Sequence, residues 1–94
     1  MSKAERQLED FEKVFKALAH ASRRNILVVL KTREKMTAGE IVERFTHKWP
    51  TITRHLKQLE DAGLVQVRKV SREQYYSLNT KRLTGVVNEW LKWF

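Results

Sequence analysis

The sequence predicts a single, mainly α-helical domain that carries one small β-hairpin. Three observations lead to this fold class. The chain has 94 residues, enough for one compact unit with a modest core. Apolar residues recur at helical spacing through most of its length, and helix-capping residues precede several of these stretches. Strand-forming residues gather in one segment only, after Gly63, where they surround a polar turn.

The first helix is predicted close to the N-terminus. Ser2 and Glu5 have the spacing of a capping box, in which two side chains satisfy the free backbone amides of a helix start. Apolar residues then recur at intervals of three and four and form one packing stripe: Leu8, Phe11, Phe15 and Leu18.

Two further helices are predicted ahead of the only proline. Ser22 is the expected N-cap of the second helix, near whose C-terminal end cations suit the helix dipole. These cations are Lys31, Arg33 and Lys35. Thr37 and Glu40 repeat the capping-box spacing and predict a short third helix.

A fourth helix is predicted from Pro50, after a turn over residues 46–49, because proline loses no hydrogen bond in the first turn of a helix. Gly63 ends this helix as a C-cap residue. Ile52, Leu56 and Leu59 share one side of it, whereas Arg54, Lys57, Gln58 and Asp61 point the opposite way. One face is therefore available to a core and the other to a partner.

The residues from Leu64 to Leu78 predict a hairpin around the turn Ser71–Glu73, and Asn79 is the expected cap of a last helix from Thr80 to Phe94. The end of that helix is strongly apolar: Val86, Val87, Trp90, Leu91, Trp93 and Phe94. A monomer of this size could hardly cover all of these side chains. We therefore expect them to join the stripe of the first helix in a homodimer interface, with completion of the chain's own core as the alternative.

Charge is unevenly distributed along the chain. It has 19 Lys and Arg against 11 Asp and Glu, a net charge of +8 that favours a polyanionic partner such as nucleic acid or an acidic membrane surface. Residues 48–82 contain eight basic and three acidic residues, whereas residues 1–15 contain three basic and four acidic residues. Binding to phosphates is therefore expected from the second half, although basic charge that only aids solubility is an alternative.

Several functional classes find no support in the sequence. There is no cysteine, no apolar run approaching the roughly 20 residues of a membrane span, and no signal-peptide core at the start, so we expect a cytoplasmic protein. No nucleophile–base arrangement, carboxylate pair or glycine-rich phosphate loop indicates an enzyme. No cofactor is expected.

Two short helices joined by a four-residue turn and followed by a hairpin predict a helix-turn-helix over residues 37–62 with a β wing over residues 64–78. The second of these helices fits the major groove of double-stranded DNA, where Arg can bond guanine and Gln can bond adenine. Its free face between Thr51 and Gln58 is therefore predicted to read DNA.

Four segments in this order resemble the ArsR/SmtB type of winged-helix transcriptional regulator. They are FKALAHASRRNILVVL, MTAGEIVERF, WPTITRHLKQLEDAGLV and a wing ending in YYSL, which together span about residues 15–78. The resemblance implies a homodimer built on the first and last helices, residues 1–19 and 80–94, a recognition helix from about Pro50 to Ala62, and repression at an operator. It also implies recognition-helix contacts from Thr51, Thr53, Arg54 and His55, and wing contacts from Lys69 and Arg72.

The predicted DNA-binding set combines this resemblance with the free face and the charge. It consists of Lys48, Trp49, Thr51, Thr53, Arg54, His55, Lys57, Gln58, Arg68, Lys69 and Arg72. Trp49 departs from the family's pattern, because His47, Lys48 and Trp49 replace a Leu-Ser-Gln-like turn. Its indole is expected to pack on the wing, with stacking against the sugar-phosphate backbone as the alternative.

The chain also lacks the family's metal ligands, a Cys-x-Cys pair on the third helix or Asp, His and Glu on the last, and its three histidines fall on different elements. A regulator that does not sense metal is therefore expected. Two other functions stay open, a protein-interaction module and a nucleic-acid binder without sequence preference. Control by the protein's own abundance, by an unidentified protein partner or by a small-molecule effector stays open as well.

Overall fold

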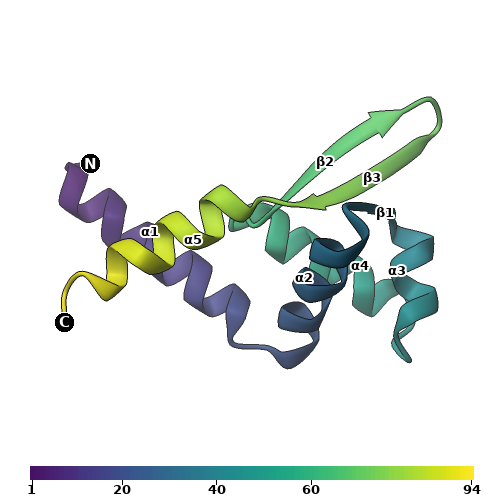
Figure 1. Ribbon diagram of the computed structural model, residues 1–94, viewed down its shortest axis with the longest axis horizontal. Helices are drawn as coiled ribbons and strands as arrows, with labels where there is room; N and C mark the ends of the chain where they lie inside the picture. Colours follow the sequence, from purple (N-terminus) through teal and green to yellow (C-terminus); the bar gives the residue numbers. More distant parts are fainter.

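A computed structural model describes all 94 residues as five helices and a three-stranded sheet (Figure 1). The elements are α1 (Lys3–Leu18), α2 (Ala21–Arg33), β1 (Lys35–Thr37), α3 (Ala38–Arg44), α4 (Trp49–Asp61), β2 (Val65–Val70), β3 (Glu73–Leu78) and α5 (Thr80–Leu91). Helices α2, α3 and α4 form one body, from which the hairpin β2–β3 projects as a wing. Helices α1 and α5 cross each other at the other end, where both termini lie. This is the winged helix-turn-helix that the sequence predicts.

One apolar core joins the helical body to the terminal helices. The inward stripe of α4, Ile52, Leu56 and Leu59, is almost fully buried, as expected. The whole core comprises Phe11, Val14, Ala17, Ile26, Leu27, Leu30, Met36, Ile41, Ile52, Leu56, Leu59, Ala62, Leu64, Val65 and Val86. Because burying one such large side chain contributes about 1.5–3 kcal/mol, this core fixes the back of α4 against the domain and leaves its other face outside.

Most of the predicted helix ends are present. The Ser2 hydroxyl accepts a hydrogen bond from the backbone amide of Glu5 at 3.1 Å, and Thr37 and Glu40 form a complete capping box. Pro50 lies in the first turn of α4. Gly63 adopts a φ of 77°, and the amides of Gly63 and Leu64 donate back to the last turn of α4 at 2.9 Å. This positive φ is the reason for glycine at the end of α4.

Helix α2 begins earlier than predicted. Its N-cap residue is His20 rather than Ser22, and His20 Nδ1 accepts the backbone amide of Ser22 at 3.2 Å. Histidine is an uncommon N-cap residue, so capping preference alone favoured the serine.

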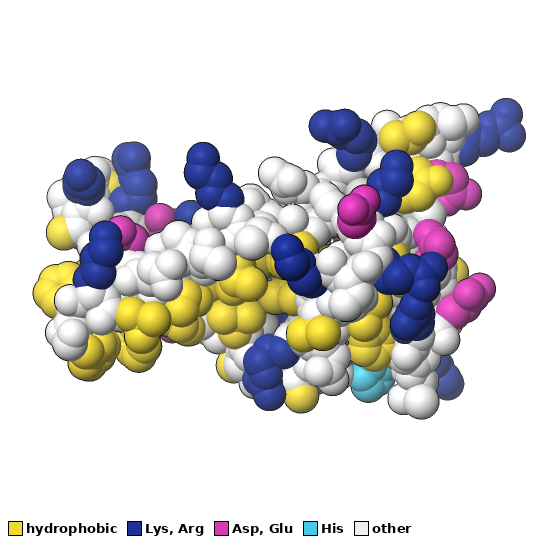
Figure 2. Space-filling view, viewed as in Figure 1, with side chains coloured by type: hydrophobic (Ala, Val, Ile, Leu, Met, Phe, Trp, Pro, Cys, Tyr) yellow, Lys and Arg dark blue, Asp and Glu magenta, His cyan; other side chains and the backbone are white.

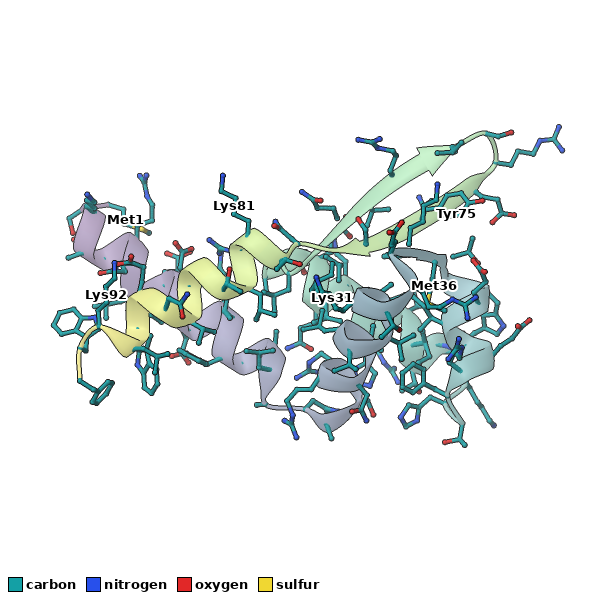
Figure 3. The ribbon with its side chains drawn as sticks, viewed as in Figure 1. Met1, Lys31, Met36, Tyr75, Lys81 and Lys92 are labelled. Atoms are coloured by element: carbon teal, nitrogen blue, oxygen red, sulfur yellow. The ribbon has the colours of Figure 1, made fainter.

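Strand β1 is the element that the sequence prediction missed. Lys35 was expected at the end of the second helix, but α2 ends at Arg33 and Glu34 turns the chain with a φ of 66°. Residues 35–37 then pair antiparallel with β3, which places Met36 opposite Tyr76 and buries the Met36 side chain (Figure 3). Three residues are too few to show alternation, so only this pairing reveals the strand.

The wing is a tight hairpin. Its register runs from Val65 opposite Leu78 to Val70 opposite Glu73, so Ser71 and Arg72 alone form the turn. Glu73, which was predicted in the turn, belongs to β3. The turn lies at the tip of the wing, far from the core (Figure 1).

The terminal helices bury only part of the predicted dimer surface. Phe11 and Val86 are each 8% exposed and belong to the chain's own core, which corrects their assignment to a dimer interface. Phe15, Leu18 and Val87 are half-buried. The remaining side chains are exposed, and they are Leu8, Trp90, Leu91, Trp93 and Phe94. Helix α5 ends at Leu91, three residues before the predicted end at Phe94. None of the helices combines the length and apolar character that a membrane span requires.

Candidate DNA-binding surface

Helix α4 presents a polar face that the rest of the chain leaves open. Thr53, Arg54 and Lys57 are exposed along it, and Thr51 and Gln58 are half-buried at its margin. The Thr53 hydroxyl donates to the Trp49 carbonyl at 2.8 Å. Lys57 forms an exposed ion pair with Asp61 at 3.3 Å, whereas Arg54 has no ion pair. Such exposed pairs are worth little, so both cations are free to meet an anionic partner.

His55 does not lie on this face, which corrects its place in the predicted DNA-binding set. Its side chain is 8% exposed and packs toward α2. The Nη1 atom of Arg23 lies 3.4 Å from His55 Nδ1. Because arginine can only donate, His55 Nδ1 must accept, which requires a neutral imidazole with its proton on Nε2. His55 therefore supports α4 from behind and does not reach a base.

All three histidines of the chain gather on the buried side of α4, although they come from different parts of the sequence. The His20 and His55 rings have centroids 4.6 Å apart, and those of His47 and His55 are 6.0 Å apart. His47 Nε2 lies 2.7 Å from the hydroxyl of Ser22. The cluster connects the turn before α4 and the start of α2 to α4. No group of three or more His, Asp or Glu side chains is arranged to hold a metal ion.

The environment of His55 favours its neutral form. Burial lowers the pKa of His55 below its ordinary value, and the charges of His20, Arg23, His47 and Arg54 lower it further. Protonation of His55 would place a second positive group against Arg23.

Trp49 packs on α3, a contact that the sequence did not predict. A Cβ atom on Gly39 would lie 3.3 Å from Cη2 of the Trp49 indole, so the absence of a side chain at Gly39 lets the indole lie close. Trp49 remains 54% exposed. Together with Lys48, it forms the open N-terminal edge of α4, where Lys48 provides no side-chain cap.

The wing contributes a separate group of cations. Arg68, Lys69 and Arg72 are all exposed along β2 and its turn. Lys35 of β1 lies over the Tyr75 ring, with Nζ 5.2 Å from the centroid. Figure 2 shows Lys and Arg side chains on the wing and along the upper edge of the terminal helices. An exposed face of α4 and a basic wing can meet bases and phosphates respectively.

Comparisons with known proteins agree with this geometry. A family model described as a helix-turn-helix domain matches residues 18–68. The transcriptional repressor SdpR of Bacillus subtilis is 41% identical over 75 residues, which is 80% of this chain and 82% of SdpR. The solved structure of an ArsR-like transcriptional regulator from Rhodococcus sp. RHA1 superposes with a TM-score of 0.82 at 28% identity, covering 90% of this chain and 79% of that one. The chain belongs to the ArsR family.

This ArsR-family chain is thus a DNA-binding transcriptional regulator and not an enzyme. The solution structure of a homodimeric winged helix-turn-helix DNA-binding domain from Mycobacterium bovis, described as a possible ArsR-family regulator, has a TM-score of 0.77 and 25% identity. The superposition covers 98% of this chain and 87% of the Mycobacterium bovis domain. The match to that domain includes the terminal helices, which lie outside the helix-turn-helix model.

Proposed function

We propose that this protein is a homodimeric repressor that binds an imperfect palindrome, reading bases with α4 and holding phosphates with the wing. The observation that carries the proposal is the open polar face of α4, which has Arg54 at its centre and lies next to a basic wing. Behind this face, every buried side-chain nitrogen and oxygen atom has a hydrogen-bond partner. A rigid back and an exposed front are what base readout requires, because bonds to base edges depend on exact placement of the side chain.

Arg54 is the proposed base-reading residue, since its guanidinium can bond guanine O6 and N7 together. Thr51, Thr53, Lys57 and Gln58 are the proposed neighbours of this contact. Lys48, Trp49, Arg68, Lys69 and Arg72 are proposed to meet the sugar-phosphate backbone. SdpR is described as a transcriptional repressor, which supports repression as the outcome of binding.

The proposed dimer rests on the apolar end of the terminal helices. Trp90 packs against Phe15 and Phe94, with ring centroids 5.0 Å away in each case, yet it stays 38% exposed. Trp93 and Phe94 are 69% and 89% exposed. Figure 2 shows hydrophobic side chains along the lower edge of this end of the molecule. A second copy would cover this surface, and the homodimeric relative from Mycobacterium bovis supports that arrangement.

A two-fold dimer places its recognition helices about 34 Å apart, in successive major grooves on one side of DNA. The operator is therefore an inverted repeat with half-sites about one helical turn apart. Autorepression, in which the dimer binds its own promoter, is the proposed mode of control. A regulator of this kind responds to its own abundance and requires no bound effector.

Selection of fragmented genomic DNA by the purified protein at about 0.15 M salt tests the proposal. Sequencing of the retained fragments should show one or a few inverted repeats near promoters, including the promoter of this protein's own gene. Uniform retention would instead indicate binding without sequence preference. A protein-interaction function would be indicated if Arg54→Ala with Lys57→Ala kept regulation in cells while Trp90→Ala abolished it.

A further inference from the structure

Helix α1 carries two lysines against the side of the recognition helix. Lys13 and Lys16 line a shallow hollow of about 190 Å³ together with Gln58, Asp61 and Ala62 from the end of α4. The first helix was expected to serve dimerisation alone, because its overall charge is close to neutral. We propose that Lys13 and Lys16 form a second phosphate-binding site, which holds the DNA backbone beside α4. This proposal rests on the proposed function and adds a contact to it.

The wing and α1 lie on opposite flanks of α4. Glu60 lines a hollow with the wing residues Arg68 and Tyr75, whereas Gln58 lines the hollow with Lys13 and Lys16. Positions 58 and 60 are about 200° apart around a helix, so they mark the two sides of the reading face. The recognition helix is thus bordered by basic residues of the wing on one side and by basic residues of α1 on the other.

This arrangement matches the shape of DNA. The major groove is about 12 Å wide and is bordered by a phosphate backbone on each side. A helix that enters the groove brings its two flanks toward these two backbones. The wing would meet one of them, and Lys13 and Lys16 would meet the other, on the side of the terminal helices.

Two acidic residues of α1 close to Lys13 in the sequence, Glu9 and Asp10, are paired with cations. Glu9 pairs with Lys13 at 3.1 Å across exposed side chains, and Asp10 faces α5, where it pairs with Arg82 at 3.0 Å. Asp61 in the hollow pairs with Lys57 at 3.3 Å, and neither Lys13 nor Lys16 forms an ion pair with it. The Lys16 side chain has no ion pair, although the Lys16 backbone carbonyl accepts from Arg23 and from the Ala19 amide. An exposed pair such as Glu9–Lys13 is weak enough for Lys13 to turn to a phosphate.

The salt dependence of binding to a duplex selected from the genomic fragments tests the site. Each phosphate that the protein neutralises contributes about 0.9 to the steepness of log K against log salt. In the proposed homodimer each substitution removes one cation from both protomers, so Lys16→Gln should lower the slope by about 1.8 and Lys13→Gln/Lys16→Gln by about 3.6. The affinity for the operator and for random DNA should fall by the same factor, because phosphate contacts carry no sequence information.

Two control variants separate a local effect from a change in net charge. Lys31→Gln removes a lysine from α2 (Figure 3). Lys31 lines a different hollow with Val28 and Leu83, so this variant should leave the slope unchanged. Lys13→Arg/Lys16→Arg keeps both charges and should keep the slope. In hydroxyl-radical footprints, the wild-type protein should protect sugars on the inner side of each half-site, and the glutamine double variant should lose that protection.

A wild-type slope and footprint for the glutamine double variant would overturn the second site while leaving the proposed function intact. The same holds if Lys31→Gln lowers the slope as much as Lys16→Gln does, because the effect would then be one of net charge. Failure of the wild-type protein to prefer any duplex would instead reject the proposed function. Sedimentation of each variant confirms that its oligomeric state matches that of the wild-type protein.

Discussion

Arg23 Nη1 lies 3.4 Å from Nδ1 of His55, and this contact joins the start of α2 to the back of the recognition helix. The same guanidinium donates from Nε to the Ala17 carbonyl at 2.7 Å and from Nη2 to the Lys16 carbonyl at 3.1 Å. Arg23 is 8% exposed, so its charge is held almost entirely by these three contacts. It also places a cation at the C-terminus of α1, where the helix dipole is negative.

Arg23→Met should therefore destabilise the fold by about 2–3 kcal/mol, because the buried bond to the Ala17 carbonyl, the part-buried bond to the Lys16 carbonyl and the contact with His55 are all lost. Urea unfolding measures this change. Arg24→Gln is the matched control, since Arg24 caps the same helix end by a single exposed bond to Leu18 at 2.8 Å. Its cost should stay under about 1 kcal/mol. Equal costs for the two variants would show that the buried guanidinium does not organise the core.

Stability should decline in mildly acidic solution because of His55. Its pKa is lowered in the folded state, chiefly by burial and then by the nearby charges of His20, Arg23, His47 and Arg54. The unfolded chain therefore binds a proton more readily, and linkage makes folding less favourable as protons are added. The stability from neutral His55 is complete above pH about 6.5 and is lost as the pH falls from there through the lowered folded-state pKa.

Urea midpoints measured between pH 8 and pH 5 test this dependence. The His55→Gln variant, which cannot titrate at this position, should show a flatter profile over the same range. If both proteins lost stability in parallel, the dependence would have to come from another group.

Two glycines should respond to alanine in opposite directions. Gly63→Ala should cost about 1–2 kcal/mol, because Gly63 has a φ of 77° and an added Cβ would meet Arg82 Nε at 3.1 Å. Gly85→Ala should add about 0.5–1 kcal/mol, since it lies within α5 and an added Cβ would meet nothing within 4 Å. Thermal unfolding of the two variants compares them directly. A stabilised Gly63→Ala would contradict the C-cap role of Gly63.

Arg54 and the wing should affect different properties of DNA binding. Arg54→Ala should reduce operator affinity by about 1–3 kcal/mol and relax the preference at one base pair, leaving affinity for random DNA nearly unchanged. Lys69→Gln/Arg72→Gln should weaken binding to both DNAs equally and lower the salt slope. Fluorescence anisotropy with matched duplexes separates the two effects. An equal loss on both duplexes for Arg54→Ala would exclude a base contact by Arg54.

Trp90 should be a strong contributor to dimerisation. Trp90→Ala removes the contacts with Phe15 and Phe94 and should weaken self-association about 30-fold, as expected for an aromatic anchor worth about 2 kcal/mol. Val70→Ala is the control, because Val70 is 50% exposed at the end of β2 in the wing, away from the terminal helices. Sedimentation equilibrium at micromolar concentration measures both. A wild-type protein that stays monomeric under these conditions would refute the proposed dimer.

Local signals in the sequence were sufficient to place most helices and the wing. The capping box at Thr37, Pro50 at the start of α4 and Gly63 after its end act over three or four residues, so they can be recognised without tertiary contacts. The stripe Ile52, Leu56 and Leu59 likewise predicted which face of α4 is buried. The exposed positions of Arg54 and Lys57 followed from the same periodicity.

Other features depend on residues far apart in the chain. Strand β1 exists because β3 offers a free edge 40 residues later, as the pairing of Met36 with Tyr76 shows. His55 was predicted at the DNA surface because of the family resemblance, whereas its packing with Arg23, His20 and His47 makes it a buried residue. Phe11 and Val86 belong to the core because α1 crosses α5, and Lys13 and Lys16 lie beside Gln58 because α1 also packs on α4. Helix periodicity gives the face on which a side chain lies, but the neighbour of that face is chosen by long-range packing, which no local pattern encodes.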